Sequence, residues 1–229
     1  MTGFDAVLDN VFWHALSGSQ AEYSVGTGDV RRYARGFSPI VAFRDPWSAA
    51  FEALAPLCDT GEEVYCDGRS GPAPVGWTVH REVLMHRMVW EGGEPPEDQA
   101  PDARPLGAGD VEQALRLAAL TRPGPFGPRT LELGDYFGYF DGTHLIAMAG
   151  ERAHAGRLRE ISGICTHPDH QGRGFARRLT SKLVHRQACR GKLPFLHVLV
   201  ENTAAIALYE RLGFRARYQS LARVLSRRG

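Results

Sequence analysis

The stretch from His167 to Ala176 constrains the fold more than any other part of this chain, because it joins a predicted strand to a predicted helix. Residues 158–166 have the β-branched and apolar content of a strand, and residues 174–190 have the length and polarity of a helix. Between them, Gly172, Gly174 and Ala176 are too small to block an approach to the backbone. The N–H groups of such a turn can converge on one anion, and the helix dipole adds positive potential. The sequence therefore predicts an anion cradle at the start of this helix.

Two well-known glycine motifs do not describe this loop. A Walker loop needs a Lys-Ser or Lys-Thr pair after its glycines, and none follows here. The Gly-x-Gly-x-x-Gly spacing of a dinucleotide fold is also absent, since only Gly172 and Gly174 fit it. A purely structural tight turn stays open as the alternative interpretation.

The residues around the loop are more specific than the loop itself. The motif Gln171-x-x-Gly174-x-Ala176 follows Cys-Thr-His-Pro168, and Asn202-x-x-Ala205-x-x-x-Tyr209-x-x-x-Gly213-Phe214 comes after it. In this order the two motifs resemble the GNAT superfamily of N-acetyltransferases, and its FR47-like group most closely, over roughly residues 100 to 229. The resemblance implies the α/β, layered GNAT acyl-CoA N-acyltransferase fold with a mixed, largely antiparallel sheet. It also implies acetyl-CoA as cosubstrate.

The same resemblance implies which residues bind the cofactor. Backbone amides of the loop would hold the CoA pyrophosphate, and Ala176 replaces a commoner glycine there. The strand before the loop would splay from its neighbour and pair with the pantetheine arm, where its amides would also polarise the thioester carbonyl. The implied cofactor-binding residues are Ile164, Cys165, Thr166, Gln171, Gly172, Arg173, Gly174, Phe175, Ala176, Asn202 and Tyr209.

Acyl transfer to an amine needs a neutral amine, stabilisation of an oxyanion and a proton for the departing thiolate. By resemblance, Tyr209 would supply this proton; the alternative is a tyrosine packed against the sheet with its hydroxyl at the rim. Glu160 occupies a position where some family members carry a catalytic glutamate, so it would deprotonate the amine directly or through a water. The alternative for Glu160 is a surface carboxylate paired with Arg157 or Arg159. Strand alternation predicts one shared face for Glu160, Ser162, Ile164 and Thr166.

A segment rich in proline, glycine and acidic residues at 91–105 indicates a linker. We therefore expect a smaller N-terminal α/β domain at 1–92, a linker at 93–101 and the GNAT domain at 102–229. A degenerate copy of the GNAT fold is one interpretation of the first domain, and its expected role is to wall the acceptor site. Its predicted elements are helices at 7–16 and 47–57 and strands at 36–43, 63–66 and 75–90.

The second domain is expected to follow the order β-α-β-β-β-α-β-α-β. Its clearest turn is Asp141-Gly142, a strong hairpin signal between two strands. The predicted elements are strands at 102–106, 136–140, 144–149, 158–166, 195–200 and 214–224 and helices at 110–120, 174–190 and 203–212.

The charge of the chain is unevenly distributed. Residues 157–229 hold 15 Lys and Arg against four acids, a net charge of +11, whereas the first 156 residues carry a net charge of −10. The basic part should attract an anion, and the acidic part favours a cationic amine as acceptor. A basic stripe at Arg178, Lys182, Arg186 and Arg190 would also suit nucleic acid, but no aromatic residues interleave it, so nucleic-acid binding is disfavoured.

Composition sets the expectations for location and metal content. The chain is 43% apolar, has no apolar stretch of the ~20 residues that a membrane span needs and shows no signal peptide, so a cytoplasmic protein without membrane attachment is expected. Its four cysteines lack paired spacing, and His167 and His170 lack a third ligand nearby. Neither a disulfide framework nor a metal site is therefore expected.

The predicted activity is direct transfer of acetyl from acetyl-CoA to a primary amine. The chain would then be an acyltransferase of the class that transfers groups other than amino-acyl groups. The alternative is a non-catalytic acyl-CoA-binding sensor or regulatory module, which would need neither Tyr209 nor Glu160. The acceptor, a small molecule or a peptide amine, stays open, as does the oligomeric state, with a homodimer among the options.

Overall fold

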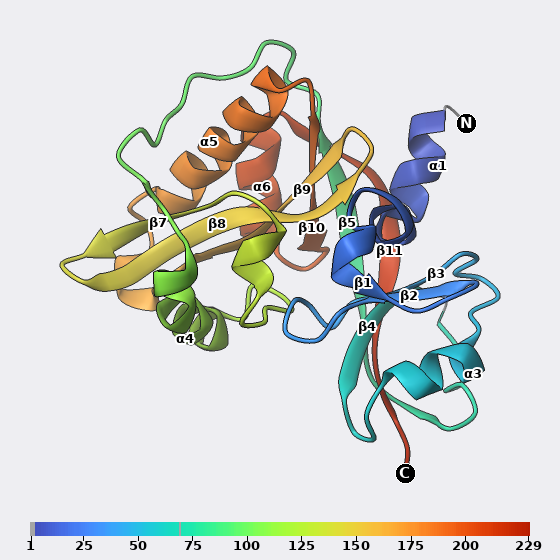
Figure 1. The fold of residues 1–229 in the computed structure, drawn as a ribbon. Helices are drawn as coiled ribbons and strands as arrows, with labels where there is room; N and C mark the ends of the chain where they lie inside the picture. Colours follow the sequence, from blue (N-terminus) through green and yellow to red (C-terminus); the bar gives the residue numbers. More distant parts are fainter. Residues whose placement is uncertain (1–2, 69) are drawn as a thin grey trace.

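One large sheet organises the molecule (Figure 1). The computed structural model describes residues 3–68 and 70–229. Among these residues, eight strands lie in the order β4-β11-β5-β10-β9-β8-β7-β6, and all neighbouring pairs are antiparallel except β9 with β10. The predicted α/β architecture with a mixed, largely antiparallel sheet is confirmed. The strands are β4 (Glu63–Gly68), β5 (Trp77–Trp90), β6 (Arg104–Pro105), β7 (Tyr136–Asp141), β8 (His144–Ala155), β9 (Leu158–Thr166), β10 (Leu193–Leu199) and β11 (Phe214–Arg227).

Helices cover both faces of this sheet (Figure 1). Two helices after β9 pack on one face, where Leu179 and Tyr209 share a core cluster with Ile161 and Leu196. The other face is covered by the helix before β7 and by the N-terminal helices, whose residues form two further clusters against β8, β9 and β10. The helices are α1 (Gly3–Asp9), α2 (Val11–His14), α4 (Val111–Thr121), α5 (Phe175–Cys189) and α6 (Thr203–Arg211).

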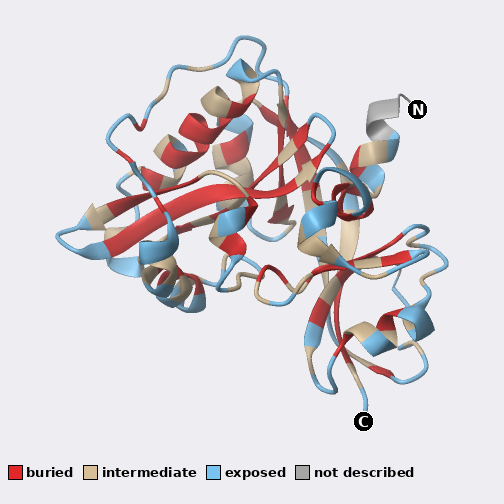
Figure 2. Ribbon diagram, in the orientation of Figure 1, coloured by how far each residue is buried: buried red, intermediate tan, exposed pale blue. Residues whose placement is uncertain are grey.

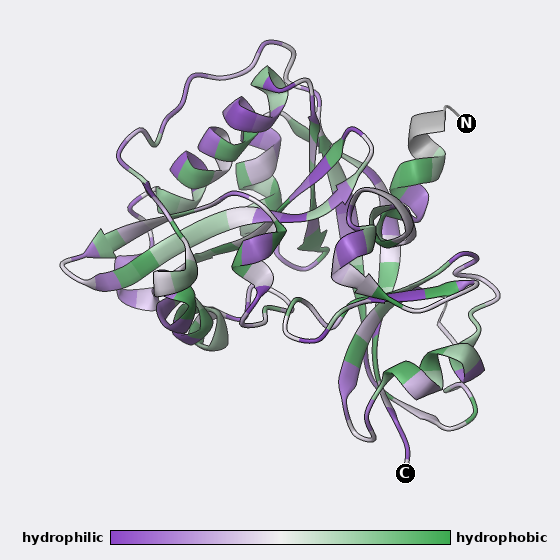
Figure 3. Cartoon of the chain, viewed as in Figure 1, coloured by the Kyte–Doolittle hydropathy of each residue, from purple (hydrophilic) through white to green (hydrophobic). Residues whose placement is uncertain are grey.

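The burial of α5 and β8 follows from their sequences. In α5, Leu179, Leu183 and Val184 are buried at helical spacing, and hydrophilic and hydrophobic stretches alternate along its ribbon in Figure 3, as expected for a helix with one apolar face. β8 is buried at nearly every position, because other elements cover both of its faces (Figure 2). β8 therefore forms the middle of the core beside β9.

Strands from both sides of the predicted linker share the large sheet. β5 pairs with β10 on one side and with β11 on the other, and β4 pairs with β11. The division into domains stays a prediction, but the sheet runs across it without a break. The linker itself lies along α5, where Asp98 accepts a hydrogen bond from Lys182 Nζ at 2.6 Å and His185 contacts the Pro96 carbonyl at 2.7 Å.

A small sheet and a short helix complete the N-terminal part. Its apolar core joins Phe43, Leu54 and Trp77 to Leu225 near the C-terminus. These elements are β1 (Ser24–Val25), β2 (Val30–Tyr33), β3 (Val41–Phe43) and α3 (Phe51–Leu54). Short 3₁₀ or π turns lie at Ala15–Ser19, Ala21–Tyr23, Ala55–Leu57, Ala108–Asp110, Thr130–Leu133 and Pro168–His170.

The two predicted N-terminal helices need correction. The helix expected at 7–16 is interrupted at Asn10, whose side-chain amide donates to the carbonyls of Phe43 and Arg44 at 2.9 and 3.0 Å. The helix expected at 47–57 begins only at Phe51, because the Asp45 carboxylate accepts from the Trp47 N–H at 2.9 Å and closes a turn instead.

The strand predicted at 36–43 is also shorter than expected. Only Val41–Phe43 pairs as a strand, because the carbonyls of Gly36 and Phe37 accept from the Arg129 N–H and the Thr130 hydroxyl. The elements predicted for 102–229 all occur in the expected order, with β8 and β11 longer than expected. Throughout the described ranges, each helix is too short or too polar to traverse a lipid bilayer.

Candidate active site

The strands β9 and β10 diverge like the two arms of a fork. Their parallel pairing is limited to three residues of each strand: Leu193–Phe195 of β10 pairs with Leu158–Glu160 of β9. The last pair is Phe195 with Glu160. From Ile161 onward β9 continues in register with β8, while β10 continues in register with β5. The facing edges of β9 and β10 therefore border an opening whose apex is the Glu160–Phe195 pair. The splay expected from the family resemblance is present.

A bulge in β9 changes which side chains share a face. Met148 pairs with Cys165 and Gly150 with Ser162, so β9 carries one extra residue at this point, where Gly163 has a φ of 63°. Ile161 and Ile164, three residues apart, consequently pack toward the same cluster on the α5 face. The predicted common face of Glu160, Ser162, Ile164 and Thr166 is therefore wrong for Ile164 and Thr166, because the extra residue shifts the alternation of every residue after it.

The glycine loop after β9 leaves the start of α5 open. Gly172 and Gly174 have φ values of 75° and 80°, and Gly174 is the N-cap of α5 without any side-chain cap. A Cβ built on either glycine would meet no heavy atom within 4 Å. These glycines are thus required by their backbone conformation, and the space in front of them is open. Free N–H groups at the first turn of a 15-residue helix are a ready site for a phosphate.

The cations beside the loop are engaged to different degrees. Arg173 Nη1 lies 2.8 Å from His170 Nδ1, and its guanidinium lies 5.1 Å from the Phe175 ring centroid. Arg177 donates instead to the Gln99 side chain at 2.6 Å. Among the described residues, Arg173 pairs with no carboxylate, so it is the loop cation best able to meet an anionic ligand.

The basic stripe on α5 is neutralised within the fold. Every member pairs with an aspartate of the acidic segment 91–105 or of the turn before β7: Arg178 with Asp102, Lys182 with Asp98, and both Arg186 and Arg190 with Asp135, at 2.6 to 2.9 Å. The stripe is therefore not a row of free cations. Because these cations are already paired, the stripe offers little free positive charge to a nucleic acid.

Tyr209 and Asn202 both belong to α6. The Tyr209 side chain is buried in the cluster of α5, α6 and β10, edge-on to Phe214 at 6.1 Å. Burial raises the pKa of Tyr209 to about 12, so its hydroxyl is protonated at neutral pH. Asn202 is the N-cap of α6, and its Oδ1 accepts from the Ala205 N–H at 3.1 Å.

Glu160 lies at the apex of the fork and is almost inaccessible, with 1% of its side chain exposed. It accepts two hydrogen bonds from Arg152, at 2.9 and 2.6 Å, and lies 2.7 Å from His197 Nδ1. Burial alone would raise the pKa of Glu160, but the charge of Arg152 and the hydrogen bond with His197 hold that pKa well below its usual range. The alternative of a surface pair is wrong, because Arg157 and Arg159 donate to backbone carbonyls instead.

His197 and Arg152 were not expected from the sequence. A histidine in the apolar run at 195–200 was the available signal, since alternation places it on the same face as Phe195. The N-terminal segment covers this face: the Phe12 ring stacks on His197 at 5.4 Å and 13°, and Tyr33 donates to Gln20, which in turn donates to the Arg152 carbonyl. Residues between 12 and 33 thus cover the apex of the fork.

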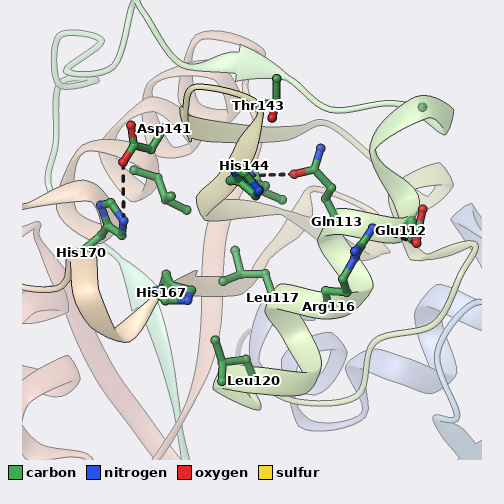
Figure 4. Close-up of a pocket in the computed structure, with 13 residues that line it drawn as sticks. Glu112, Gln113, Arg116, Leu117, Leu120, Asp141, Thr143, His144, His167 and His170 are labelled. Carbon is green, nitrogen blue, oxygen red and sulfur yellow. Dashed lines mark hydrogen bonds and ion pairs between the residues drawn. The ribbon is translucent and has the colours of Figure 1, made fainter.

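A separate cleft of about 670 Å³ lies between α4, the β7–β8 hairpin and the segment after β9 (Figure 4). His167 and His170 border it, and His170 Nε2 lies 3.9 Å from the Asp141 carboxylate. Gln113 and Arg116 of α4 form the opposite wall. Within the described part of the chain, no three His, Cys, Asp or Glu side chains are grouped to hold a metal ion.

Comparison with known proteins identifies close structural relatives. A family model described as FR47-like protein matches residues 136–224. A crystal structure assigned to the GNAT family, from Novosphingobium aromaticivorans DSM 12444, is 36% identical with a TM-score of 0.87, and the alignment covers 97% of this chain and 99% of that one.

Curated relatives match over shorter segments. A mycothiol acetyltransferase of Streptomyces griseus subsp. griseus is 35% identical over 91 residues, 39% of this chain and 28% of that protein. The N-alpha-acetyltransferase RimI of Mycobacterium tuberculosis is 41% identical over 56 residues, 24% of this chain and 34% of that protein. The chain therefore matches only 28% and 34% of the length of these two relatives. Their names support the predicted enzyme class, an acyltransferase.

Proposed function

The chain belongs to the GNAT family, and on this premise we propose that it transfers the acetyl group of acetyl-CoA directly to a primary amine. The observation that carries the proposal is the opening between β9 and β10, which leads to the uncapped glycine loop of α5. A pantetheine arm needs a free strand edge to pair with, and a pyrophosphate needs free N–H groups. The chain provides both features in direct succession.

Cofactor binding would rest on backbone groups more than on side chains. The free edge of β9 at Ile164, Cys165 and Thr166 would pair with the pantetheine arm. Because the Oδ1 of Asn202 already caps α6, this residue would offer its amide nitrogen. The pyrophosphate would lie against the loop formed by Gln171, Gly172, Arg173, Gly174, Phe175 and Ala176.

Tyr209 would act as the acid that protonates the CoA thiolate, since its phenol carries a proton at neutral pH. The Cys165 thiol is a poor nucleophile, because burial raises its pKa to about 11. This supports direct transfer without a covalent enzyme intermediate. For Glu160 the surroundings favour a positioning role, because a carboxylate held ionised by Arg152 and His197 is a weak base.

The acceptor is proposed only as a primary amine. The two curated relatives are named for different reactions, a mycothiol acetyltransferase and an N-alpha-acetyltransferase, so neither acceptor can be assigned to this chain. A panel of small amines, amino acids and peptides with a free N-terminus covers the class. The cytoplasmic location and the homodimer rest on the sequence alone.

Calorimetric titration of the protein with acetyl-CoA tests the cofactor. We expect saturable binding in the wild type and its loss in Gly174→Glu, because the new side chain brings bulk and negative charge to the pyrophosphate site. Gly191→Glu is the matched control. Gly191 lies at the other end of α5 with a φ of 66° and open space around it, so this substitution adds the same charge and a similar backbone strain as Gly174→Glu. Absence of binding by the wild type would refute the proposal.

Thiol release in the presence of the amine panel tests catalysis. We expect Tyr209→Phe to lower the rate by about 100-fold or more without weakening acetyl-CoA binding, since a general acid contributes typically ~10²–10⁴-fold. Saturable binding of acetyl-CoA with no thiol release for any amine would favour the sensor module over the enzyme.

A further inference from the structure

His197 lies at the apex of the fork, and neither cofactor binding nor the proposed acid Tyr209 gives it a role. His197 lies two residues beyond Phe195, the last β10 residue in register with β9, so its side chain projects on the same sheet face as that of Phe195. Glu160, directly opposite Phe195, contacts it on that face. An acceptor amine that meets a thioester held in the fork would approach this apex.

The hydrogen bond to Glu160 fixes the tautomer of His197. The carboxylate is ionised, because Arg152 donates two hydrogen bonds to it, and an ionised carboxylate can only accept. The contact of 2.7 Å between Nδ1 and Oε1 therefore requires a proton on Nδ1. In the neutral ring, Nε2 then carries a lone pair. A carboxylate that orients a histidine in this way prepares it to accept a proton.

The second ring nitrogen of His197, Nε2, makes no hydrogen bond with the described residues. Only 5% of the side chain is exposed, and this nitrogen is buried. The buried Tyr136 hydroxyl likewise has no partner within the described part of the chain. The Tyr136 ring lies against the β9 bulge, since a Cβ at Gly163 would lie 3.3 Å from it. Buried polar atoms are normally paired, so this Nε2 is able to accept a hydrogen bond from a polar group that arrives with a ligand.

We propose that His197 is the general base of the transfer reaction and that Glu160 is its positioning residue. The inference rests on the proposed acetyltransferase function and deepens it. His197 Nε2 takes one proton from the acceptor ammonium, and the neutral nitrogen attacks the thioester carbonyl. The C–N bond forms, the C–S bond breaks and Tyr209 protonates the thiolate. The acylated nitrogen then gives its extra proton to the Tyr209 phenolate, which regenerates the acid. The His197 imidazolium releases its proton to solvent, so one proton is released per turnover.

The charges around His197 are compatible with this cycle. Glu160 and Arg152 reach it from β9 and β8, and together they are neutral. Arg87, its register partner on β5, is paired with Asp67 and bonded to the Tyr218 hydroxyl. From the N-terminal segment the contact is the uncharged Phe12 ring. An imidazolium formed at His197 therefore meets one carboxylate directly and no unpaired cation among these groups.

Long-range ¹H–¹⁵N spectra of the histidine rings test the tautomer without any acceptor. At neutral pH we expect His197 to be protonated at Nδ1 with a bare Nε2, and this preference to be lost in Glu160→Gln, whose amide can donate as well as accept. The signals are assigned by their disappearance in His197→Gln. An Nε2-protonated ring, or an imidazolium across the whole pH range in which the protein is folded, would overturn the proposal.

The pH dependence of transfer separates a base from a structural histidine. With glycinamide as probe amine, we expect thiol release by His197→Gln at pH 7 to fall about 100-fold, because base catalysis is worth ~10²–10⁴-fold. The rate should then rise about tenfold per pH unit toward the pKa of the amine itself, as hydroxide replaces the base. Tyr33→Phe is the control: it removes a hydroxyl bonded to Gln20 on the same face and should keep the wild-type profile.

Calorimetry separates the two proposals. His197→Gln should bind acetyl-CoA as the wild type does, because the histidine lies outside the glycine loop. A variant that transfers with the wild-type pH profile would sink the base role and leave the acetyltransferase intact. A wild type that binds no acetyl-CoA would instead remove the function on which the inference rests.

Discussion

At the scale of single residues, the apex of the fork depends on how charges are paired inside the fold. The side chains of Arg152 and Glu160 are 8% and 1% exposed, and both lie far from bulk water. Burying two ions is costly, and their attraction offsets the cost only with close geometry and additional hydrogen bonds. Here two hydrogen bonds join the pair and His197 supplies a third. Either ion without the other would be an uncompensated buried charge.

Arg152→Met should therefore lower the free energy of unfolding by about 3–5 kcal/mol, the usual cost of breaking a buried pair. Urea denaturation measures it. Arg116→Met is the matched control, since Arg116 pairs with Glu112 on the exposed surface of α4 and should matter by less than about 1 kcal/mol. The double variant Arg152→Met with Glu160→Met should recover part of the loss. Equal small losses for Arg152 and Arg116 would contradict this account.

At the scale of elements, the two helices on the cofactor side begin in different ways. α6 starts at Asn202, whose side chain satisfies one N–H of the first turn. α5 starts at Gly174, which has no side chain and takes a left-handed conformation at φ 80° and ψ 9°. A capped helix start has a hydrogen-bond acceptor for its first-turn N–H groups within the protein. An uncapped start leaves these N–H groups available to a ligand.

Gly174→Ala should destabilise the protein by about 1–2 kcal/mol, although the space around the position is open, because the cost arises from the left-handed backbone. Thermal unfolding measures it. Gly191→Ala, at a φ of 66° near the other end of α5, should cost a similar amount. If Gly174→Ala left the stability unchanged while Gly191→Ala lowered it, the loop at Gly174 would have relaxed to another conformation.

At the scale of the whole molecule, the large sheet depends on a strand from the N-terminal part. β5 lies between β10 and β11; it pairs with β11 along nearly all of its 14 residues and with β10 over residues 85–89. Without β5, β10 would lose its antiparallel neighbour. The pair of β11 and β4 would then be separated from the other strands of the sheet. The predicted linker is thus a covalent connection between parts that share one core.

A fragment of residues 93–229 should therefore fail to fold alone, although it contains the complete glycine loop and α6. Far-UV circular dichroism with urea titration would show no cooperative transition. Addition of a separate fragment of residues 1–92 should restore the transition, because β5 can then pair with β10 and β11. A cooperative transition of the isolated 93–229 fragment would instead support two autonomous domains.

The sequence by itself determined the features that depend on neighbours along the chain. The Asp141-Gly142 hairpin, the glycine loop at 171–176 and the order of strands and helices after residue 102 follow from local turn chemistry and periodicity, and the structure has them. The same logic failed at Asp45, whose side chain closes a turn rather than capping a helix. Local rules offered both outcomes there, and only neighbouring contacts select one.

The tertiary structure alone decided what Glu160 does. Its partners lie 8 and 37 residues away, on β8 and β10, and no local pattern distinguishes Arg152 from the nearer Arg157 and Arg159. The bulge at Gly163, the place of β5 in the sheet and the aspartates that neutralise α5 are likewise set by pairing between distant segments. Periodicity constrains which face of an element is buried, whereas register and long-range contacts are chosen only when the whole core packs.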